Sequence, residues 1–483
     1  MICVAKIATL APKDFFVAGS TPFSVGVAAY GDEAVKVSIS ILRNGQTVAS
    51  SRPTMALDYG LRVPADSYNL RADLTPGDYV VSMSASSAGA ATQESAELKV
   101  FDAAAATILV TDQTTFDAAI ATIKAASYSH GRIILADGYY TYPSGVNYDL
   151  STTDKLISFE SRTSGVQFTG IAPNIKWAYW YRCRFSNSSG TAFNAKADSH
   201  HFFEKCAFIS AKTALIAVAD SYVRVEDCHM SAVSSGMISA RIVRGLSWSY
   251  LDGVVFQNCQ VIDGTTGYRG VVAGSDTVAG KKKAIWCLFD GVSTGVVIRN
   301  NVLVDDYSSI LRTGQSFSKA IIVGNSFTTS GASPIVIAMM TGSFLAHNTV
   351  YHTGTGSSIA VTGNTSGNFV ANCWFQTLDS SIRRLSDSGV WKNNASTSDI
   401  SVGVNCLVSV DPKFQNSYRF IGVSSPLRGT GISLSSVRTV QGIQASNQIG
   451  ALPYHKDVGL ASIYRAVLFD PSFSYVSPAV VVL

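Results

Sequence analysis

The segment Trp180-Tyr-Arg-Cys183-Arg-Phe185 decides the fold, because its pattern recurs along the chain. In every copy a large apolar residue stands three positions before a Cys or Asn. In all but the last copy another apolar residue stands two positions after it. The Cys or Asn positions are Cys183, Cys206, Cys228, Cys259, Asn301, Asn325, Asn348, Cys373 and Asn394. Six of the eight intervals between them measure about 21 to 25 residues, a period that indicates a solenoid.

The residue before each Cys or Asn marks a corner in the chain. Side chains alternate along a strand, so positions three before and two after cannot share one face without a bend. The preceding residue is mostly Asn, Asp or Gly. These residues tolerate the left-handed backbone conformation of a tight bend. Each copy therefore predicts a strand, a two-residue corner and a second strand.

A further strand is predicted eight to twelve residues after each corner. These strands are expected in residues 213–218, 309–312, 333–337, 357–361 and 380–383. Their alternation predicts that Ile310 points inward and Leu311 outward. Three short strands in about 22 residues fit one coil of a parallel β-helix, in which coils stack about 4.8 Å apart. No copy carries a helical pattern, which excludes leucine-rich and helical repeats.

Stacking of the coils places the Cys and Asn positions in one internal ladder. Asn side chains in register hydrogen-bond along such a column, and Cys serves there as a small buried hydrophobe. This accounts for five of the eight cysteines without disulfides. Metal ligation needs ligands a few residues apart, such as Cys-x-x-Cys, which is lacking. His200, His201 and His229 stand at different positions relative to the ladder, so stacking would not bring them together around one metal ion. Neither a metal nor a cofactor is predicted.

Residues 107–142 are predicted to form the N-terminal end of the β-helix. An amphipathic α-helix is indicated there, with one apolar face formed by Phe116, Ile120 and Ile123. Thr114, followed by Asp117 three residues later, gives a start similar to a capping box. Such a helix would cover the otherwise exposed end of the sheets.

Residues 131–146, GRIILADGYYTYPSGV, together with the strand and helix before them, resemble the opening of the pectate-lyase-like right-handed parallel β-helix proteins. Similarity to the last coils of chondroitinase-B-like members is found in residues 410–414, 418–420, 424–427 and 447–451. The resemblance covers about residues 105–455 and implies a right-handed helix. The family contains polysaccharide lyases, glycosidases, phage tailspikes and non-catalytic virion proteins, so the fold does not settle the function.

The first hundred residues lack the Cys or Asn repeat and instead show short alternating strands separated by turns. Val35–Ile41 alternates as a half-buried strand, and Arg43-Asn-Gly45 is a hairpin-type turn. About seven short strands in this region predict an immunoglobulin-like β-sandwich. The whole chain is thus expected to be all-β. Its predicted divisions are the sandwich at 1–102, the β-helix with its cap helix at 103–455, and an apolar tail at 456–483, which folds back or docks on a neighbouring subunit.

Composition limits the classes of function. Charged residues make up 14% of the chain and the net charge is +4, so no strongly anionic partner is implied. The Lys281-Lys282-Lys283 run lacks interleaved aromatics and is interpreted as a solvated loop, without nucleic-acid binding. No stretch reaches the roughly 18 apolar residues that a membrane span needs. Lys6 and the short apolar segment Ile7–Ala11 make a poor signal peptide, so export by that route is not expected.

The best candidate catalytic pair is Glu204 and Glu226, which stand two residues before ladder positions on successive coils. Stacking would project both carboxylates outward, about 5 Å apart. Mutual repulsion can raise one pKa and create an acid–base pair. The alternative is that Lys205, Arg224 and Arg182 simply neutralise the two carboxylates.

The candidate glycan contacts are Lys196, Arg241 and Trp180. Lys196 and Arg241 belong to an outward strip of the further strands, and this strip has no carboxylate. These cations could neutralise a uronate, as basic residues do in members of the resembling family, or act as ordinary surface charges. Trp180 belongs to an aromatic cluster in which alternation buries some rings as core and points others outward, where they can stack on sugars.

The leading hypothesis is a bacteriophage virion protein, a tail- or head-surface β-helix that decorates the particle or binds host-surface glycan. It rests on the resemblance, the rigid helix and the poor signal peptide, and it implies a virion location and other virion proteins as partners. A polysaccharide depolymerase, lyase or hydrolase, is the alternative, although the groove poor in carboxylates favours a non-enzyme. A purely structural subunit is the third interpretation. The resemblance to tailspikes implies a homotrimer, for which the sequence offers no coiled-coil heptads.

Overall fold

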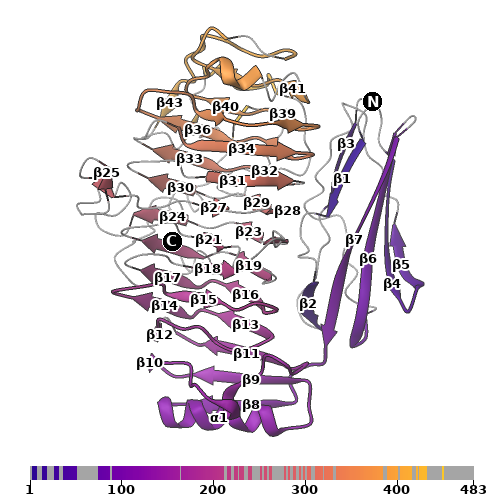
Figure 1. The fold of residues 1–483 in the computed structure, drawn as a ribbon, viewed down its shortest axis with the longest axis vertical. Helices are drawn as coiled ribbons and strands as arrows, with labels where there is room; N and C mark the ends of the chain where they lie inside the picture. Colours follow the sequence, from indigo (N-terminus) through magenta and orange to yellow (C-terminus); the bar gives the residue numbers. More distant parts are fainter. Residues whose placement is uncertain are drawn as a thin grey trace.

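The structure is a computed structural model, and three long parallel sheets form its β-helix, beside a smaller N-terminal sheet (Figure 1). Between positions 215 and 318 it describes the strands and short segments only. Elsewhere it describes residues 3–7, 13–18, 27–31, 36–51, 74–87, 90–163, 165–210, 320–329, 333–383, 389–400, 403–415, 420–421, 424–431 and 449–450. The predicted all-β architecture with a right-handed parallel β-helix is confirmed.

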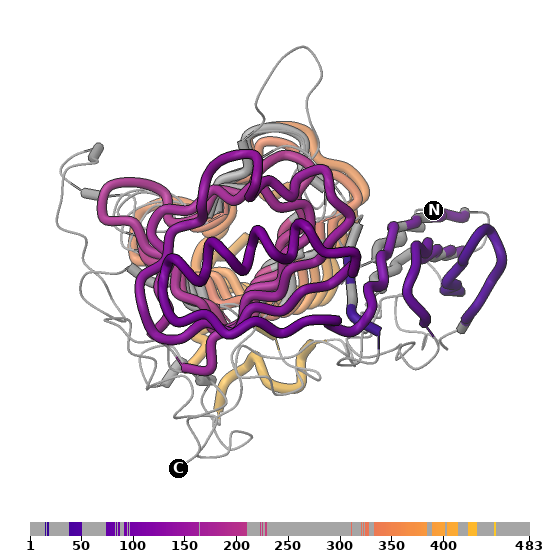
Figure 2. Tube along the Cα trace, turned by 90° about the horizontal axis from the view of Figure 1, so that it is seen from below, coloured from indigo at the N-terminus to yellow at the C-terminus, as the bar shows by residue number. Residues whose placement is uncertain are grey.

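The coils contribute strands to three sheets. One coil contains β13 (Trp177–Tyr181), β14 (Arg184–Asn187) and β15 (Phe193–Ala195), and β16 (His200–Glu204) opens the next. Strands of the β13 kind form a 12-stranded sheet, and those of the β14 kind form an 11-stranded sheet. Strands of the β15 kind, with the short strands β22 (Leu251–Asp252), β28 (Ser293–Thr294) and β38 (Thr365–Ser366), form a 10-stranded sheet. We call these the first, second and third sheets. Figure 2, seen along the helix, shows the coils superposed around a common interior.

The corner between the first and second sheets is the left-handed bend that the sequence predicts. Positive φ angles of 50° to 66° occur at Arg182, Lys205, Gly324, His347, Asn372 and Asn393. Three of these residues are neither Gly nor Asn, so the stacking of the coils overrides the local preference. The repeat continues one copy further than the pattern showed. Asn405 has a φ of 54° and precedes Cys406.

The internal ladder joins each coil to the one before it. The Asn348 side chain accepts the backbone N–H of Asn325 at 3.1 Å and donates to the Ile322 carbonyl at 2.8 Å. Cys228 accepts the backbone N–H of Cys206 at 3.3 Å and its thiol donates to the Phe203 carbonyl at 3.6 Å. Asn and Cys therefore bond the same two groups of the preceding coil, the backbone N–H of its ladder residue and the carbonyl three residues earlier. The corner takes both groups out of the regular strand pairing.

The ladder thiols are structural. No disulfide joins Cys183, Cys206, Cys228 or Cys373, and all four are buried, as predicted. Burial raises the pKa of Cys373 to about 12 and keeps the pKa of Cys183 well above its ordinary value. Protonated, buried thiols are poor nucleophiles. The fifth predicted position, Cys259, lies outside the described residues.

A second ladder, which the sequence did not reveal, lies at the corner between the third and first sheets. The Asn368 side chain accepts the backbone N–H of Ser343 at 2.9 Å and donates to the Met340 carbonyl at 2.9 Å. Gly342 and Gly367 supply the positive φ angles at this corner, 54° and 62°. Successive coils are thus joined at two corners by the same kind of hydrogen bonds, which run from one side chain to the backbone of the preceding coil.

Helix α1 (Gln113–Ala125) covers the first coil. Its predicted apolar face is confirmed, since complete burial is found for Phe116, Ile120 and Ile123. The predicted cap is corrected: the N-cap is Asp112, not Thr114, because the helix begins at Gln113. Asp112 accepts the backbone N–H of Thr115 at 2.8 Å, and this bond lowers the pKa of the Asp112 carboxyl.

Two other expectations for the coils are corrected. Leu311, in β31 (Leu311–Ser318), pairs with Ile335 and is 1% exposed, so it points inward and the predicted alternation slips by one residue. Residues 380–382 form a 3-10 helix instead of a strand, capped by the Asp379 carboxylate. Pairing with the neighbouring coil sets the register at Leu311, and the Asp379 cap favours the helical turn at 380–382.

The N-terminal region contains two small sheets. The two-stranded sheet pairs β1 (Cys3–Ile7) with β3 (Val27–Gly31). The five-stranded sheet has the order β2 (Lys13–Val17), β7 (Ala90–Phe101), β6 (Gly77–Ser87), β4 (Lys36–Arg43) and β5 (Gln46–Ser51). An immunoglobulin-like sandwich stays a prediction, as do the domain limits. The last strand of this region ends at Phe101 and the helix begins with β8 (Ala106–Val110). The predicted tail at 456–483 lies outside the described residues.

An aromatic cluster joins the N-terminal region to the first sheet. Phe15 of β2 and Phe101 of β7 meet the Trp177 ring edge-on, with centroids 5.7 and 5.6 Å away. Leu156 completes the cluster, and all four side chains are buried. Burial of three large rings favours a fixed joint over a loosely tethered one.

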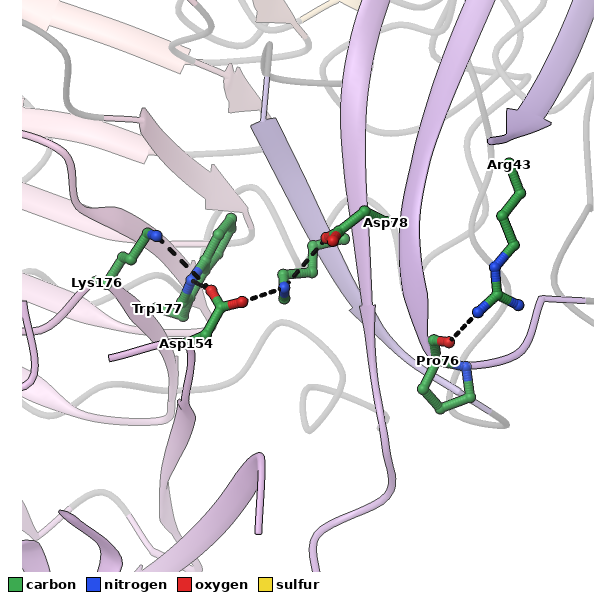
Figure 3. A network of polar contacts seen from close by, with 7 residues as sticks. Arg43, Pro76, Asp78, Asp154, Lys176 and Trp177 are labelled. Atoms are coloured by element: carbon green, nitrogen blue, oxygen red, sulfur yellow. Dashed lines mark hydrogen bonds and ion pairs between the residues drawn. The ribbon is translucent and has the colours of Figure 1, made fainter. Parts of the chain in front are cut away.

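A polar network lies beside this cluster (Figure 3). The Lys99 ammonium reaches Asp154 of the β-helix at 2.5 Å and Asp78 of β6 at 3.1 Å. Burial opposes the charge on Lys99, but the two carboxylates outweigh it and raise the pKa of Lys99. Asp154 also accepts the Trp177 indole N–H at 3.2 Å. Lys99 thus links the two parts of the chain through one shared cation.

Two short segments, 424–431 and 449–450, form a strap on the outside of the second sheet (Figure 2). Leu427 and Ile449 pack over the Trp374 ring, which is fully buried. The backbone N–H of Gly450 donates to the Asn372 carbonyl at 2.6 Å. The strap therefore covers a corner of the helix that would otherwise face solvent.

Gly450→Ala is expected to loosen this strap by about 1 to 3 kcal/mol, because Gly450 has a φ of 89° and an added Cβ would lie 2.6 Å from the Thr349 hydroxyl. Gly429→Ala is the matched control, since Gly429 has a φ of 68° but open space around its Cβ. Hydrogen exchange at residue 450 measures the effect. Equal protection in the two variants would show that the close contact contributes nothing.

Candidate functional site

The outward face of the first sheet, between β9 (His130–Leu135) and β16, gathers charged and aromatic side chains. The pairing places Glu160 of β11 (Leu156–Ser161) opposite Tyr181, and Tyr181 opposite Glu204. Neighbouring strands lie about 4.8 Å apart, so these three residues form one column across three coils. We use the name first-sheet face for Arg132, Glu160, Tyr179, Tyr181, Phe202 and Glu204.

The carboxylates of this face already have partners. Tyr179 donates its phenol hydrogen to Glu204 at 2.7 Å, and the Lys205 ammonium lies 3.5 Å from the same carboxylate. Arg132 pairs with Glu160 at 2.5 Å. Burial, reinforced by the charge of Glu204, keeps the pKa of Tyr179 far above its ordinary value. Tyr179 is therefore a hydrogen-bond donor at every ordinary pH.

The predicted catalytic pair lies on neighbouring strands. Glu204 ends β16 and stands opposite Glu226, which ends β19 (Tyr222–Glu226). The side chain of Glu226 lies outside the description, so the separation of the two carboxyl groups stays a prediction. Lys205 pairs with Glu204, which is the contact that the neutralising alternative expected.

Trp180 lies inside the helix and is fully buried. Its ring stacks on Phe159 at 4.0 Å and parallel to Phe203 at 6.3 Å. Alternation along β13 points Trp180 inward and Tyr179 and Tyr181 outward. Trp180 is therefore a core residue, which corrects its predicted exposure, and the outward rings of β13 include Tyr181 and Tyr179, the second of which packs against the cluster of Phe15, Phe101 and Trp177.

The structure does not bring Lys196 and Arg241 to the first-sheet face. Lys196 is exposed in the turn between β15 and β16, and Glu204 is the last residue of β16, so the two lie at opposite ends of this strand. Arg241 ends β21 (Ile238–Arg241) in the third sheet, and its side chain is not described. Their predicted roles remain untested.

Sequence reasoning missed Glu160 and Arg132, because the Cys or Asn pattern does not extend to β9 and β11. The available signal was the coil spacing. Phe159 pairs with Trp180, so Glu160 occupies the same position in its coil as Tyr181 and Glu204.

In the described part of the chain, no group of three or more His, Cys, Asp or Glu side chains is arranged to hold a metal ion. None of the helices among the described residues is long and apolar enough to cross a membrane.

No family model matches the sequence, and no curated protein matches it. Among solved structures, a pectate lyase, Pel9A, is similar to this chain at 11% identity. The alignment covers 73% of this chain and 97% of that chain, with a TM-score of 0.39. A score this low carries no argument about activity. The strand pairing itself defines the class, a single-stranded parallel β-helix protein with an added N-terminal β-region.

Proposed function

We propose that this protein is a β-helix that binds an extended polysaccharide along its first-sheet face. The observation that carries the proposal is the register of Glu160, Tyr181 and Glu204 on three successive strands. Aromatic rings that alternate with charged groups suit sugars, which offer apolar ring faces and hydroxyl groups. A row repeated about every 4.8 Å suits a polymer better than a single small ligand.

The contacts of the face favour binding over catalysis. A glycosidase needs one carboxyl group to give a proton and a second carboxylate to assist. Here Arg132 engages Glu160, while Lys205 and Tyr179 engage Glu204. Neither carboxylate is left without a partner in the absence of substrate.

A depolymerase is the second candidate, and one observation favours it. Glu204 and Glu226 stand opposite each other on adjacent strands, and the backbones of such strands lie about 4.8 Å apart. The carboxyl groups of retaining glycosidases are separated by about 5 to 5.5 Å.

The biological setting that we propose is the surface of a bacteriophage particle, where the glycan would belong to the host. The long stack of coils and the fixed N-terminal joint suit a rigid projection, and the phage assignment rests on the sequence argument. The copy number of the chain on purified particles, together with its mass in solution, tests this setting and the expected homotrimer.

The function is tested by incubating the protein with bacterial capsule, O-antigen and uronate polysaccharides, and by following both binding and polymer size. We expect binding without loss of size. Tyr181→Ala should weaken binding about tenfold, since an aromatic contact contributes about 0.5 to 1.5 kcal/mol beyond its buried area. Tyr139→Ala is the matched control, because Tyr139 is 76% exposed in β10 (Gly138–Tyr140) of the second sheet.

Loss of polymer size on any substrate would favour the depolymerase, and Glu204→Gln should then abolish it. Equal affinities for wild type and Tyr181→Ala would remove the first-sheet face from the proposal.

A further inference from the structure

Cations line the corner that borders the first-sheet face. Arg162, Arg182 and Lys205 lie where successive coils turn from the first sheet into the second, and we call them the cationic ridge. Arg162 is exposed, and the other two are partly exposed. The backbone N–H of Arg182 bonds the Glu204 carbonyl at 3.1 Å, which fixes two of the cations on adjacent coils.

Two cations of the ridge converge on one aromatic ring. The Arg182 guanidinium carbon lies 5.2 Å from the Tyr181 ring centroid, and the Lys205 ammonium lies 5.3 Å from it. Both distances fall within the range of cation–π attraction. Tyr181 therefore positions the two charges beside the column of Glu160 and Glu204.

The ridge carries more positive charge than the described side chains around it neutralise. Lys205 shares the Glu204 carboxylate at 3.5 Å. Among the described residues, no carboxylate lies within ion-pair distance of Arg162 or Arg182. The Arg182 guanidinium donates a hydrogen bond to a neutral group, the Arg162 carbonyl, at 3.5 Å.

The backbone at the ridge is unfavourable for these residues. Arg182 and Lys205 have φ angles of 56° and 54°, a left-handed conformation that costs a side chain with a Cβ about 1 to 2 kcal/mol. Three equivalent corners have Gly324, Asn372 or Asn393, which tolerate this conformation better, and a fourth has the buried His347. The ridge differs from these corners in having two adjacent positions that both carry a partly exposed cation at this cost.

We propose that the cationic ridge binds the carboxylate or sulfate groups of an acidic polysaccharide, and so makes the first-sheet face selective for acidic over neutral glycans. This inference rests on the proposed polysaccharide binding and adds the class of ligand. Guanidinium groups bind carboxylate and sulfate oxygens through paired N–H donors. Cations on neighbouring coils, about 4.8 Å apart, meet successive charges of an extended polymer.

The first arm of the test compares polymers. Equilibrium binding is measured with polygalacturonate, dextran sulfate and neutral dextran, at low salt and at about 0.15 M salt, where the Debye length falls to about 8 Å. We expect the acidic polymers to bind about 100-fold more tightly than dextran at low salt, and salt to reduce the difference. The two acidic polymers distinguish carboxylate from sulfate as the preferred group.

The second arm uses Arg182→Asn and Lys205→Asn. Each should weaken binding of the acidic polymers about tenfold, the size of one charge-assisted hydrogen bond. Each should also leave the melting temperature unchanged or raise it, because Asn tolerates the left-handed corner. Lys413→Asn is the matched control, since Lys413 has the same charge and a φ of 53° in a distant turn. Its affinity for the polymers should equal that of wild type.

The outcomes separate the two proposals. If the ridge variants melt at a lower temperature and bind acidic polymers as wild type does, the ridge is structural and the inference is overturned. If dextran binds as tightly as the acidic polymers and Tyr181→Ala weakens both, selectivity fails while polysaccharide binding stands. If no polymer of either kind binds, both proposals fail together.

Discussion

Replacement of Asn348 by alanine is expected to lower the free energy of unfolding by about 3 to 5 kcal/mol. The Asn348 side chain is 1% exposed and bonds the backbone N–H and the side-chain amide of Asn325, together with the Ile322 carbonyl. Alanine would leave these three buried polar groups without that partner, at a cost of about 1 to 3 kcal/mol each. Water cannot replace the side chain unless the interior opens. Urea unfolding followed by circular dichroism measures the change.

Asn348→Cys is the matched control. The chain itself uses Cys228 in the same ladder, where the thiol accepts one backbone N–H and donates to one carbonyl. Cysteine should therefore retain about half of the stability that alanine loses. If the free energy of unfolding of Asn348→Ala lies within about 1 kcal/mol of the wild-type value, the hydrogen bonds of the ladder contribute little to stability.

Mild acid is expected to destabilise the fold, through two buried histidines. His201 and His347 are each at most 1% exposed, and burial lowers the pKa of both to about 3. Their pKa in the unfolded chain is about 6.5. Between these values the unfolded state binds protons that the folded state does not, so the stability present above pH 6.5 is lost as the pH falls toward 3. The slope is about 1.4 kcal/mol per pH unit for each histidine, or about 2 kcal/mol each at pH 5.

His347→Asn isolates one of these contributions. His347 occupies a left-handed corner with a φ of 50°, and Asn372 and Asn393 have the same conformation at the next two corners. The variant should thus fold at pH 7.5, and its free energy of unfolding should fall by about 2 kcal/mol less than that of wild type between pH 7.5 and pH 5. Urea unfolding at pH 7.5, 6.0 and 5.0 gives this free energy for both proteins. An equal dependence on pH in the two proteins would show that His347 takes up its proton in the folded state as readily as in the unfolded state, contrary to its burial.

The amino-acid sequence by itself determined the repeating unit. Cys206 and Asn348 each lie three residues after a large apolar residue, and a strand, a bend and a strand follow from that spacing without knowledge of any neighbour. The left-handed corners, the buried ladder and the apolar face of α1 were predicted for this reason. Each of them depends on a few residues close together in the chain.

The cap and the register are two places where the sequence offered a choice. Thr114 and Asp112 both offer an N-cap side chain, and Asp112 is the cap because it forms a reciprocal capping box with Thr115. Leu311 and Ile310 are both apolar, and pairing with Ile335 selects Leu311 for the interior. The first choice is local, whereas packing between coils decides the second.

The candidate site was decided largely by tertiary structure, because sequence reasoning placed Glu204 but not Glu160 in its column. Glu160, Tyr181 and Glu204 are 21 to 44 residues apart, and they share a column only because successive coils stack in register. A net charge of +4 gives no sign of the cationic ridge, since the ridge arises from where Arg182 and Lys205 turn the corner. Pairing between successive strands fixes that register, and the residue pattern within one coil does not reveal it. The sequence therefore determined the coil, whereas the stacking of coils determined which side chains meet on its surface.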